Sequence, residues 1–242
     1  MGWDVRGAGT IPAVMPARPP VVLIAGRDEA QRLPATLCAL RAALPGARIV
    51  VADDGSHDAT ATVARDAGAE VVRSDEPLGK GGAATLAARA VLDVTTAPDP
   101  PIVLLCDADL GQSAGRLSAL VDAVDRGEAD LAIAVFARRV GGGFGLAVGA
   151  ARRAIARLCG LRLEAPLSGQ RAMRGEVLAC VTPFADGFGM EVGMTVDAAR
   201  AGFRVRELPL ELEHRATGRS LRGFLHRGRQ LRDLLAAAWR RR

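Results

Sequence analysis

The sequence contains one uninterrupted apolar stretch that leads directly into two acidic residues. Ile102 to Cys106 follow Pro100-Pro101 without alternating with polar residues, which predicts a strand buried on both faces. Asp107 and Asp109 come next, and residues two apart in an extended chain project to the same side. Two carboxylates held together repel each other unless a cation or a proton lies between them, and Mg²⁺ or Mn²⁺ prefers such oxygens together with substrate phosphates. The stretch therefore predicts a metal site for a diphosphate, although a solvated turn also fits the tripeptide taken alone.

Strand patterns alternate with helical patterns over the first half of the chain. Strands are expected at 21–25, 48–52, 70–73, 102–106 and 130–136, and helices at about 29–44, after Asp58, from 79 to about 94, and at about 114–126. This alternation predicts an α/β fold with a doubly wound, mostly parallel sheet sandwiched by helices. Ligands bind such sheets at the carboxyl ends of the strands. Because Gly26 to Glu29, Asp53-Asp54 and Asp107 to Asp109 all fall at such ends, we expect them to meet in one crevice.

The second half is less regular and is expected to elaborate the same domain. It predicts a helix at about 147–159, a turn or short strand at 168–171, a helix at 188–201 and a strand at 204–213. Apolar residues from Leu221 to Trp239 form one helical stripe with arginines opposite, which suits either core packing or contact with anionic lipid. The expected organisation is a flexible tail at 1–19, a domain at 20–220 and a basic amphipathic C-terminal helix at 221–242.

Charge and composition limit the partners that the chain can have. A net charge of +5 and a pI near 9.8 favour an anionic partner such as a nucleotide, a phosphorylated acceptor, an anionic membrane or nucleic acid. Nucleic acid is disfavoured, because only 3% of residues are aromatic and stacking platforms are missing. No apolar run approaches the roughly 18 residues of a membrane span, and a signal peptide is not evident, so a cytoplasmic protein is expected. The four cysteines lack a CxxC pair and are expected to be small, buried hydrophobic residues: Cys38, Cys106, Cys159 and Cys180.

Two segments with glycine are candidate ligand loops. Asp53-Asp54-Gly55-Ser56 could accept hydrogen bonds from a base or a ribose, and a simple helix cap explains it equally well. Gly79-Lys80-Gly81-Gly82 is not a Walker A motif, because Gly81 stands where that motif needs Ser or Thr. It remains a helix N-terminus with a lysine, where an anion can bind. Late in the chain, His214 could be a metal ligand or an ordinary surface residue.

Taken together and in order, these residues resemble family 2 glycosyltransferases of the GT-A fold over nearly all of residues 20–220. Val51 to Thr60 is similar to the VVDDGSxDxT nucleotide motif of that family. Ala25 to Glu29, Gly79 to Ala83 and Asp107 to Asp109 are similar to its first strand end, its GKGxA segment and its DxD motif. Within the family the chain resembles polyprenyl-phosphate sugar transferases of the dolichol-phosphate mannosyltransferase kind, with segments similar to DADL, SGxR, GYGFE and RxxGxS at 107–110, 168–171, 187–191 and 215–220. Those enzymes usually have Gln directly after DADL, whereas Gly111 precedes Gln112 here.

The resemblance implies transfer of a sugar from a UDP- or GDP-linked donor, with Mg²⁺ or Mn²⁺ as cofactor. The acceptor would be a lipid phosphate or another phosphorylated molecule, and the protein could lie on the inner face of the plasma membrane. The donor would be held by Ala25, Gly26, Arg27, Glu29, Asp53, Asp54, Lys80, Asp107 and Ala108. The metal would be held by Asp107 and Asp109, with Gln112 and His214 as further candidates. The acceptor phosphate would be held by Arg138, Ser168, Arg171, Arg215, Arg219 and Ser220. Asp109, Glu191 and Arg171 are the expected catalytic residues, with Glu191 or Asp109 as the base if the acceptor is a hydroxyl.

Three other functions stay open at this point. Glucosyl-3-phosphoglycerate synthases share the DxD motif and a late His, so a small soluble acceptor fits as well. A sugar nucleotidyltransferase would use the same crevice but would release pyrophosphate. A catalytically silent nucleotide-binding or membrane-associated regulator would show no activity that depends on Asp109.

Overall fold

The computed structural model describes residues 18–136, 145–187 and 189–212. Most of the predicted tail, Arg138 and the whole segment from 213 to 242 lie outside the described residues. The predicted C-terminal helix and five candidate site residues therefore stay predictions: Arg138, His214, Arg215, Arg219 and Ser220.

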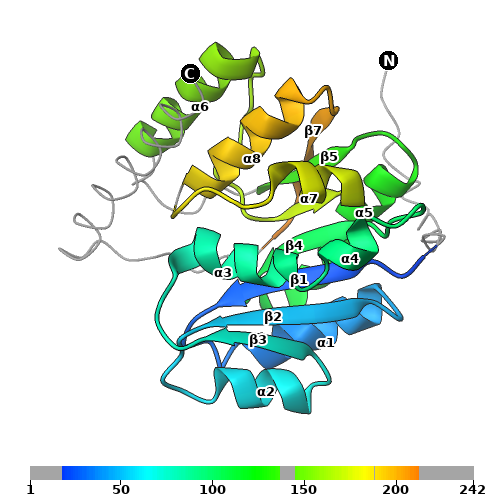
Figure 1. Cartoon of the computed structure of the whole chain (residues 1–242), viewed down its shortest axis with the longest axis vertical. Helices are drawn as coiled ribbons and strands as arrows, with labels where there is room; N and C mark the ends of the chain where they lie inside the picture. The colour runs from blue at the N-terminus through cyan, green and yellow to red at the C-terminus, as the bar shows by residue number, and fades with distance from the viewer. Residues whose placement is uncertain (1–17, 137–144, 188, 213–242) are drawn as a thin grey trace, which may run out of the picture.

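A seven-stranded sheet in the order β3-β2-β1-β4-β6-β5-β7 forms the centre of the molecule (Figure 1). Its strands are β1 (Val21–Gly26), β2 (Arg48–Asp54), β3 (Glu70–Ser74), β4 (Val103–Asp107), β5 (Leu131–Phe136), β6 (Arg171–Met173) and β7 (Val205–Leu210). All neighbouring strands are parallel except β6, which runs antiparallel to both β4 and β5. The expectation of a mostly parallel sheet is confirmed. The three-residue β6 comes later in the chain than β5 and is inserted between β4 and β5.

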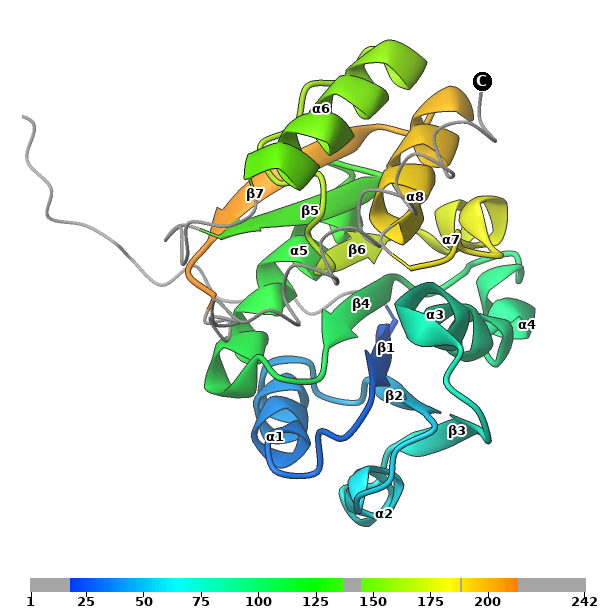
Figure 2. The same cartoon turned by 90° about the vertical axis from the view of Figure 1, so that its left-hand side faces the viewer.

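The helices pack in two layers on the sheet. They are α1 (Leu33–Ala43), α2 (Thr60–Asp66), α3 (Gly79–Arg89), α4 (Leu92–Thr95), the 3₁₀ helix η1 (Gly111–Leu117), α5 (Ser118–Asp125), α6 (Gly145–Cys159), α7 (Gly175–Val181) and α8 (Gly189–Arg200). Figure 2 shows α1 and α5 on one side of the sheet and α3, α7, α8 and α6 on the other. Within the described ranges, no helix combines the length and the apolar character needed to cross a bilayer.

Alternate residues of each buried strand contribute to opposite cores. In β1, Leu23 packs in the core with α3, α6 and α8, whereas Ile24 packs in the core with α1, η1 and α5. Both side chains are at most 2% exposed, and each such burial contributes about 1.5–3 kcal/mol. The central strands are thus fixed from both faces, which also fixes the position of their carboxyl ends.

Some element boundaries differ from the expectation for local reasons. The first helix begins at Leu33 rather than near Glu29, because Asp28 takes a left-handed φ of 56° and a turn from Glu29 to Arg32 precedes the helix. The helix expected from 79 to about 94 is divided into α3 and α4, and the one expected at about 114–126 begins earlier, as η1. Helix α7 was not expected.

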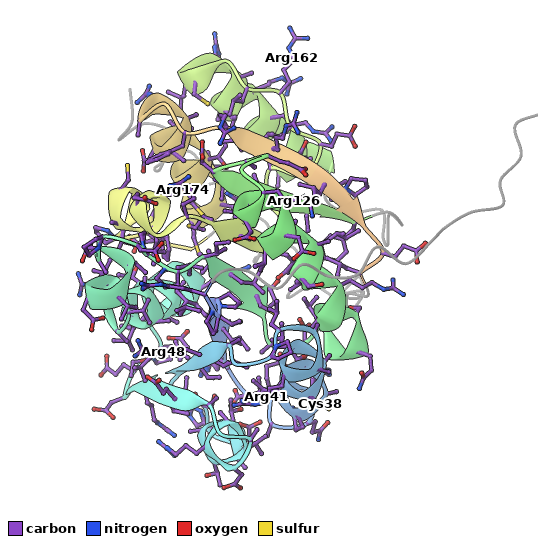
Figure 3. All side chains as sticks on the ribbon, turned by 90° about the vertical axis from the view of Figure 1, so that its right-hand side faces the viewer. Cys38, Arg41, Arg48, Arg126, Arg162 and Arg174 are labelled. Atoms are coloured by element: carbon purple, nitrogen blue, oxygen red, sulfur yellow. The ribbon has the colours of Figure 1, made fainter. Side chains whose placement is uncertain are left out.

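All four cysteines are free. Cys106 is buried in β4, and Cys159 is partly buried at the end of α6. Cys38 lies exposed on α1, beside Arg41 (Figure 3), and Cys180 is exposed on α7. The expectation of burial is therefore wrong for Cys38 and Cys180, because both lie on the outer side of a helix whose inner side covers the sheet.

Candidate active site

A cleft of about 260 Å³ opens at the carboxyl edge of β1, β2 and β4. Parallel register places Ala25 of β1 opposite both Ala52 and Asp107, so the three strands end side by side. The cleft is lined by Ala25, Gly26, Arg27, Glu29, Asp54, Lys80, Ala83, Asp107, Ala108 and Asp109. Eight of the nine predicted donor-binding residues are in this lining, together with Asp109. The exception is Asp53.

Lys80 forms ion pairs with two carboxylates from different elements. Its Nζ lies 3.0 Å from Oδ1 of Asp107, at the end of β4, and 3.1 Å from Oε1 of Glu191, in the first turn of α8. Helices α3 and α8 contact each other on the same face of the sheet (Figure 2). Burial alone would lower the pKa of Lys80, but Asp107 and then Glu191 together raise it above its ordinary value. The two carboxylates therefore favour the ammonium form of Lys80.

Gln170 and Gly169 complete the surroundings of Asp107. The Gln170 amide Nε2 donates to Asp107 Oδ2 at 2.5 Å, and its Oε1 accepts the Asp107 backbone N–H at 3.0 Å. A Cβ on Gly169 would lie 2.5 Å from Lys80 Nζ and 3.1 Å from Asp107 Oδ1, so any larger residue would have to displace the lysine from its present position. Sequence reasoning gave neither residue a role, although both lie inside the SGxR-like segment. The glycine in that segment was the sequence signal that could have pointed to a close contact there.

The two adjacent acids at the end of β2 have different tasks. Asp54 lines the cleft and accepts backbone N–H groups of Leu78 at 2.6 Å and Gly79 at 3.0 Å. It thereby holds the start of α3, from which Lys80 projects. Asp53 is fully buried, accepts the Ser56 N–H at 2.9 Å and lies 3.1 Å from Arg73. Asp53 therefore organises the loop behind the cleft in this structure and is not part of the lining.

The loops after β1 and β2 are tied to each other. Ser56 Oγ accepts the Asp28 N–H at 3.0 Å, while Asp28 Oδ1 accepts the His57 N–H at 2.8 Å. Gly55 takes a φ of +67°, which the turn requires. Asp58 accepts the N–H of Thr60, the first residue of α2, at 2.9 Å, whereas Ser56 holds the first loop. These contacts fix the backbone that carries Arg27 and Glu29.

Two candidate residues of the second half lie away from the cleft. Arg171 is fully buried, and its guanidinium donates to the carbonyls of Ser168 at 2.8 Å and Pro166 at 3.2 Å and to Thr195 Oγ1 at 2.9 Å. Burial lowers its pKa to about 10, in spite of the nearby Glu191. We therefore assign Arg171 a structural part, as the residue that shapes the loop carrying Gly169 and Gln170. Ser168 is also buried, and its Oγ has no hydrogen-bond partner among the described residues.

The charges of the cleft fit a divalent cation that is shared with a ligand. Four carboxylates and two cationic side chains line it, which leaves two negative charges. Glu191 is 2% exposed, and its Oε2 has no hydrogen-bond partner in the described part of the chain. Across the same ranges, no three or more His, Cys, Asp and Glu side chains are grouped to hold a metal by themselves. A cation at Asp107 and Asp109 would thus need further oxygens, such as those of phosphates. Gln112 is exposed in η1 and outside the lining.

Comparisons with known proteins agree with this geometry. The model of glycosyl transferase family 2 matches residues 21–179. The chain is 31% identical to an undecaprenyl-phosphate mannosyltransferase of Micrococcus luteus over 216 residues, which cover 83% of this chain and 86% of the relative. It is 32% identical to a polyprenol monophosphomannose synthase of Mycolicibacterium smegmatis over 235 residues, covering 90% and 86%.

A similar solved structure is glucosyl-3-phosphoglycerate synthase from Mycobacterium tuberculosis in complex with Mn²⁺, UDP and glucosyl-3-phosphoglycerate. It has a TM-score of 0.72 and 27% identity, and the match covers 93% of this chain and 80% of that one. The motifs, the GT-A architecture and these relatives agree, and the chain belongs to glycosyl transferase family 2 and is a glycosyltransferase.

Proposed function

We propose that this enzyme transfers a sugar from a nucleotide-diphosphate sugar to a phosphorylated acceptor, and that the acceptor is a polyprenyl phosphate. The observation that carries the proposal is the meeting of Asp54, Lys80, Asp107 and Asp109, from three separate segments, in one cleft. The two relatives, an undecaprenyl-phosphate mannosyltransferase and a polyprenol monophosphomannose synthase, support the acceptor class. Sequence similarity to them extends over more than four fifths of the chain.

The donor is proposed to enter with its diphosphate toward Arg27 and Lys80, the two cations of the cleft. Gly26 lets the donor approach the backbone closely there. A Cβ at this position would lie only 3.0 Å from Ala108 Cβ. Glu29 and Asp54 hold the surrounding backbone and side chains in place, Glu29 through an ion pair with Arg32 at 3.0 Å. Asp53 would act indirectly, through the loop after β2.

Asp109 and Asp107 would hold Mg²⁺ or Mn²⁺ together with oxygens of the diphosphate. When bound, such an ion neutralises the charge that develops on the departing nucleoside diphosphate. Similar structures of glucosyl-3-phosphoglycerate synthase, solved in complex with Mn²⁺ and UDP or with Mg²⁺ and UDP, support this ion class. Gln112 and His214 remain candidates for additional ligands.

If the acceptor is a phosphate, the proposed mechanism needs no dedicated base. A phosphate monoester has a second pKa near 6, so it is largely ionised near neutral pH and its positioning matters more than its deprotonation. Arg138, Arg215 and Arg219 are proposed for that positioning, with Ser168 and Ser220 as hydrogen-bonding partners. A hydroxyl acceptor would instead need a base, for which Glu191 or Asp109 would serve.

Product analysis tests the proposal. Purified enzyme is incubated with radiolabelled GDP-mannose or UDP-glucose, Mg²⁺ or Mn²⁺, and either a polyprenyl phosphate in detergent or 3-phosphoglycerate. We expect the label in an organic-soluble product that forms only with the polyprenyl phosphate. Label in a water-soluble product with 3-phosphoglycerate would favour the second candidate, a glucosyl-3-phosphoglycerate-synthase-like activity, which the TM-score of 0.72 supports. Release of pyrophosphate from a nucleoside triphosphate would instead indicate a nucleotidyltransferase.

Peripheral contact with the inner face of the plasma membrane is proposed alongside the lipid acceptor. Arg153 and Arg157 are exposed on α6, four residues apart and hence on one face of the helix. Co-sedimentation with anionic vesicles tests the contact. We expect binding that weakens in the double variant R153E/R157E, and no binding by either full-length protein or the chain without 220–242 would contradict the membrane proposal.

A further inference from the structure

Lys80 is the only lysine of the chain, since the other 31 of the 32 basic Lys and Arg residues are arginines. An ammonium is a compact charge with three donors, whereas a guanidinium is a wide planar fork. The space at Lys80 Nζ is small, because Gly169 comes so close that its missing Cβ would lie 2.5 Å away. Of the two basic side chains, the lysine is therefore the one that fits between Asp107 and Glu191.

The ammonium occupies a carboxylate that the proposed reaction needs. Asp107 Oδ1 is paired with Lys80 at 3.0 Å, and Asp107 Oδ2 accepts from Gln170 at 2.5 Å. Both oxygens of the first DxD carboxylate are thus engaged in the empty cleft. A divalent cation that binds Asp107 must either displace the ammonium or lie beside it, where the two positive charges repel each other.

Lys80 also has a way to leave Asp107. Its side chain is 34% exposed and lines the cleft. Two of its three N–H donors are accounted for by Asp107 and Glu191, which leaves one for a ligand. Glu191 is almost fully buried, and it can hold the ammonium of Lys80 while the ammonium exchanges its contact with Asp107 for one with a ligand.

We propose that Lys80 is a resident counter-ion that blocks Asp107 in the empty cleft and is drawn onto the donor diphosphate, which opens Asp107 to the divalent cation. The inference rests on the proposed function and extends it to the order of binding. Metal alone binds weakly, and nucleotide and metal bind cooperatively because the nucleotide removes the competing cation.

Manganese binding without nucleotide tests the block. Free Mn²⁺ is measured by electron paramagnetic resonance for the wild type, Lys80→Met and Arg27→Met. The methionine keeps the length of the stem and removes the charge. Arg27→Met removes the other cation of the cleft, which lies 3.6 Å from Asp28 in the structure. We expect Lys80→Met to bind Mn²⁺ on the order of tenfold more tightly than the wild type and Arg27→Met to change it much less. Unchanged or weaker binding by Lys80→Met, or an equal gain in both variants, would overturn the proposal.

The single lysine allows a second test in the unaltered chain. Protein labelled with ¹³C,¹⁵N-lysine gives one set of side-chain signals, and the structure predicts a nuclear Overhauser effect between Lys80 Hε and Gly169 Hα. We expect this effect to persist with millimolar Mg²⁺ alone and to weaken when UDP or GDP is added with Mg²⁺. If calorimetry shows nucleotide and Mg²⁺ bound while the effect is unchanged, the counter-ion exchange is wrong and the proposed function stands. If neither nucleotide binds with either metal, the proposed function itself fails.

Discussion

Gln170 holds Asp107 through two reciprocal hydrogen bonds, one to the carboxylate at 2.5 Å and one from the backbone N–H at 3.0 Å. The amide thereby fixes the orientation of the first DxD carboxylate from the residue just before β6, a strand that runs antiparallel to β4. Gln170 is 1% exposed, so water cannot replace it. The acid that meets the donor is therefore preorganised by a residue that does not line the cleft.

Replacing Gln170 with methionine should weaken nucleotide binding without reshaping the cleft. Hydrogen bonds to charged groups contribute about 1.5–3 kcal/mol, so we expect metal-dependent nucleotide affinity to fall at least about tenfold. Calorimetry with UDP and GDP in Mn²⁺ measures it. The matched control is Gln31→Met, at an exposed position outside the lining. Equal affinities for Gln170→Met and wild type would show that the orientation of Asp107 is irrelevant.

Gly169→Ala should impair the site more than the fold. The added Cβ would lie 2.5 Å from Lys80 Nζ and 3.2 Å from Asp107 Oδ2, and the flexible lysine end can move away at little cost in stability. We expect transfer activity to drop on the order of tenfold, as for the loss of one well-placed ionic contact, with Tm nearly unchanged. The control Gly149→Ala lies in α6 with no atom nearer than 3.9 Å, and it should keep full activity and gain about 0.5–1 kcal/mol. Equal activities of the two variants would contradict the close approach at Gly169.

Asp109→Asn removes the charge of the second DxD acid and keeps its shape. Because the metal is expected to supply several kcal/mol to the transition state, transfer should fall on the order of 10²-fold or more. Steady-state kinetics over a range of Mn²⁺ measures the loss. A silent regulator would show no such dependence on Asp109.

Thiol reactivity should follow burial. Burial raises the pKa of the Cys106 thiol well above its ordinary value, and the neighbouring Asp107 and Asp109 add to the effect. Iodoacetamide followed by mass spectrometry should modify the exposed Cys38 and Cys180 first and leave Cys106 unmodified in the native protein. Early modification of Cys106 would mean that the end of β4 is open to solvent.

Acid should remove one defined contribution to stability. The Arg204 guanidinium bonds Asp130 at 2.9 and 3.0 Å and holds the pKa of that carboxyl below its usual range. A carboxyl group whose pKa is lowered in the folded state stabilises the fold at pH values above its unfolded-state pKa, near 3.9 for Asp. This contribution is lost as the pH falls through the folded-state pKa. Asp130→Asn should therefore have a lower Tm than wild type at pH 7, and the gap should close as the pH falls from about 4 through the folded-state pKa of Asp130. The exposed Asp125→Asn is the control, and a gap that persists in acid would contradict the assignment.

Much of the site follows from local sequence patterns. An apolar strand that ends in acids is recognisable at Cys106 to Asp109, and parallel register then brings Asp107 next to Ala25. Which of two adjacent acids faces the cleft is not recognisable, because a shift of one residue exchanges the two sides of a strand. Asp53 and Asp54 show this, since the first is buried and the second lines the cleft.

The remaining features depend on contacts between distant segments. Lys80 turns to Asp107 and Glu191 only because α8 packs beside α3, and Gln170 reaches Asp107 only because β6 is inserted antiparallel beside β4. A three-residue strand and the seven-residue helix α7 are too short to give a periodic pattern. Arg171 illustrates the limit of motif transfer, because the motif predicts a phosphate contact and the packing encloses the side chain.

The most direct test of the account is anomalous scattering at the manganese edge from crystals soaked with Mn²⁺ and UDP or GDP. The account predicts one strong peak in the cleft, within about 2.0–2.3 Å of an Asp109 carboxylate oxygen and in contact with the diphosphate. Nucleotide bound without a peak at Asp109, or a peak on another surface of the protein, would contradict it.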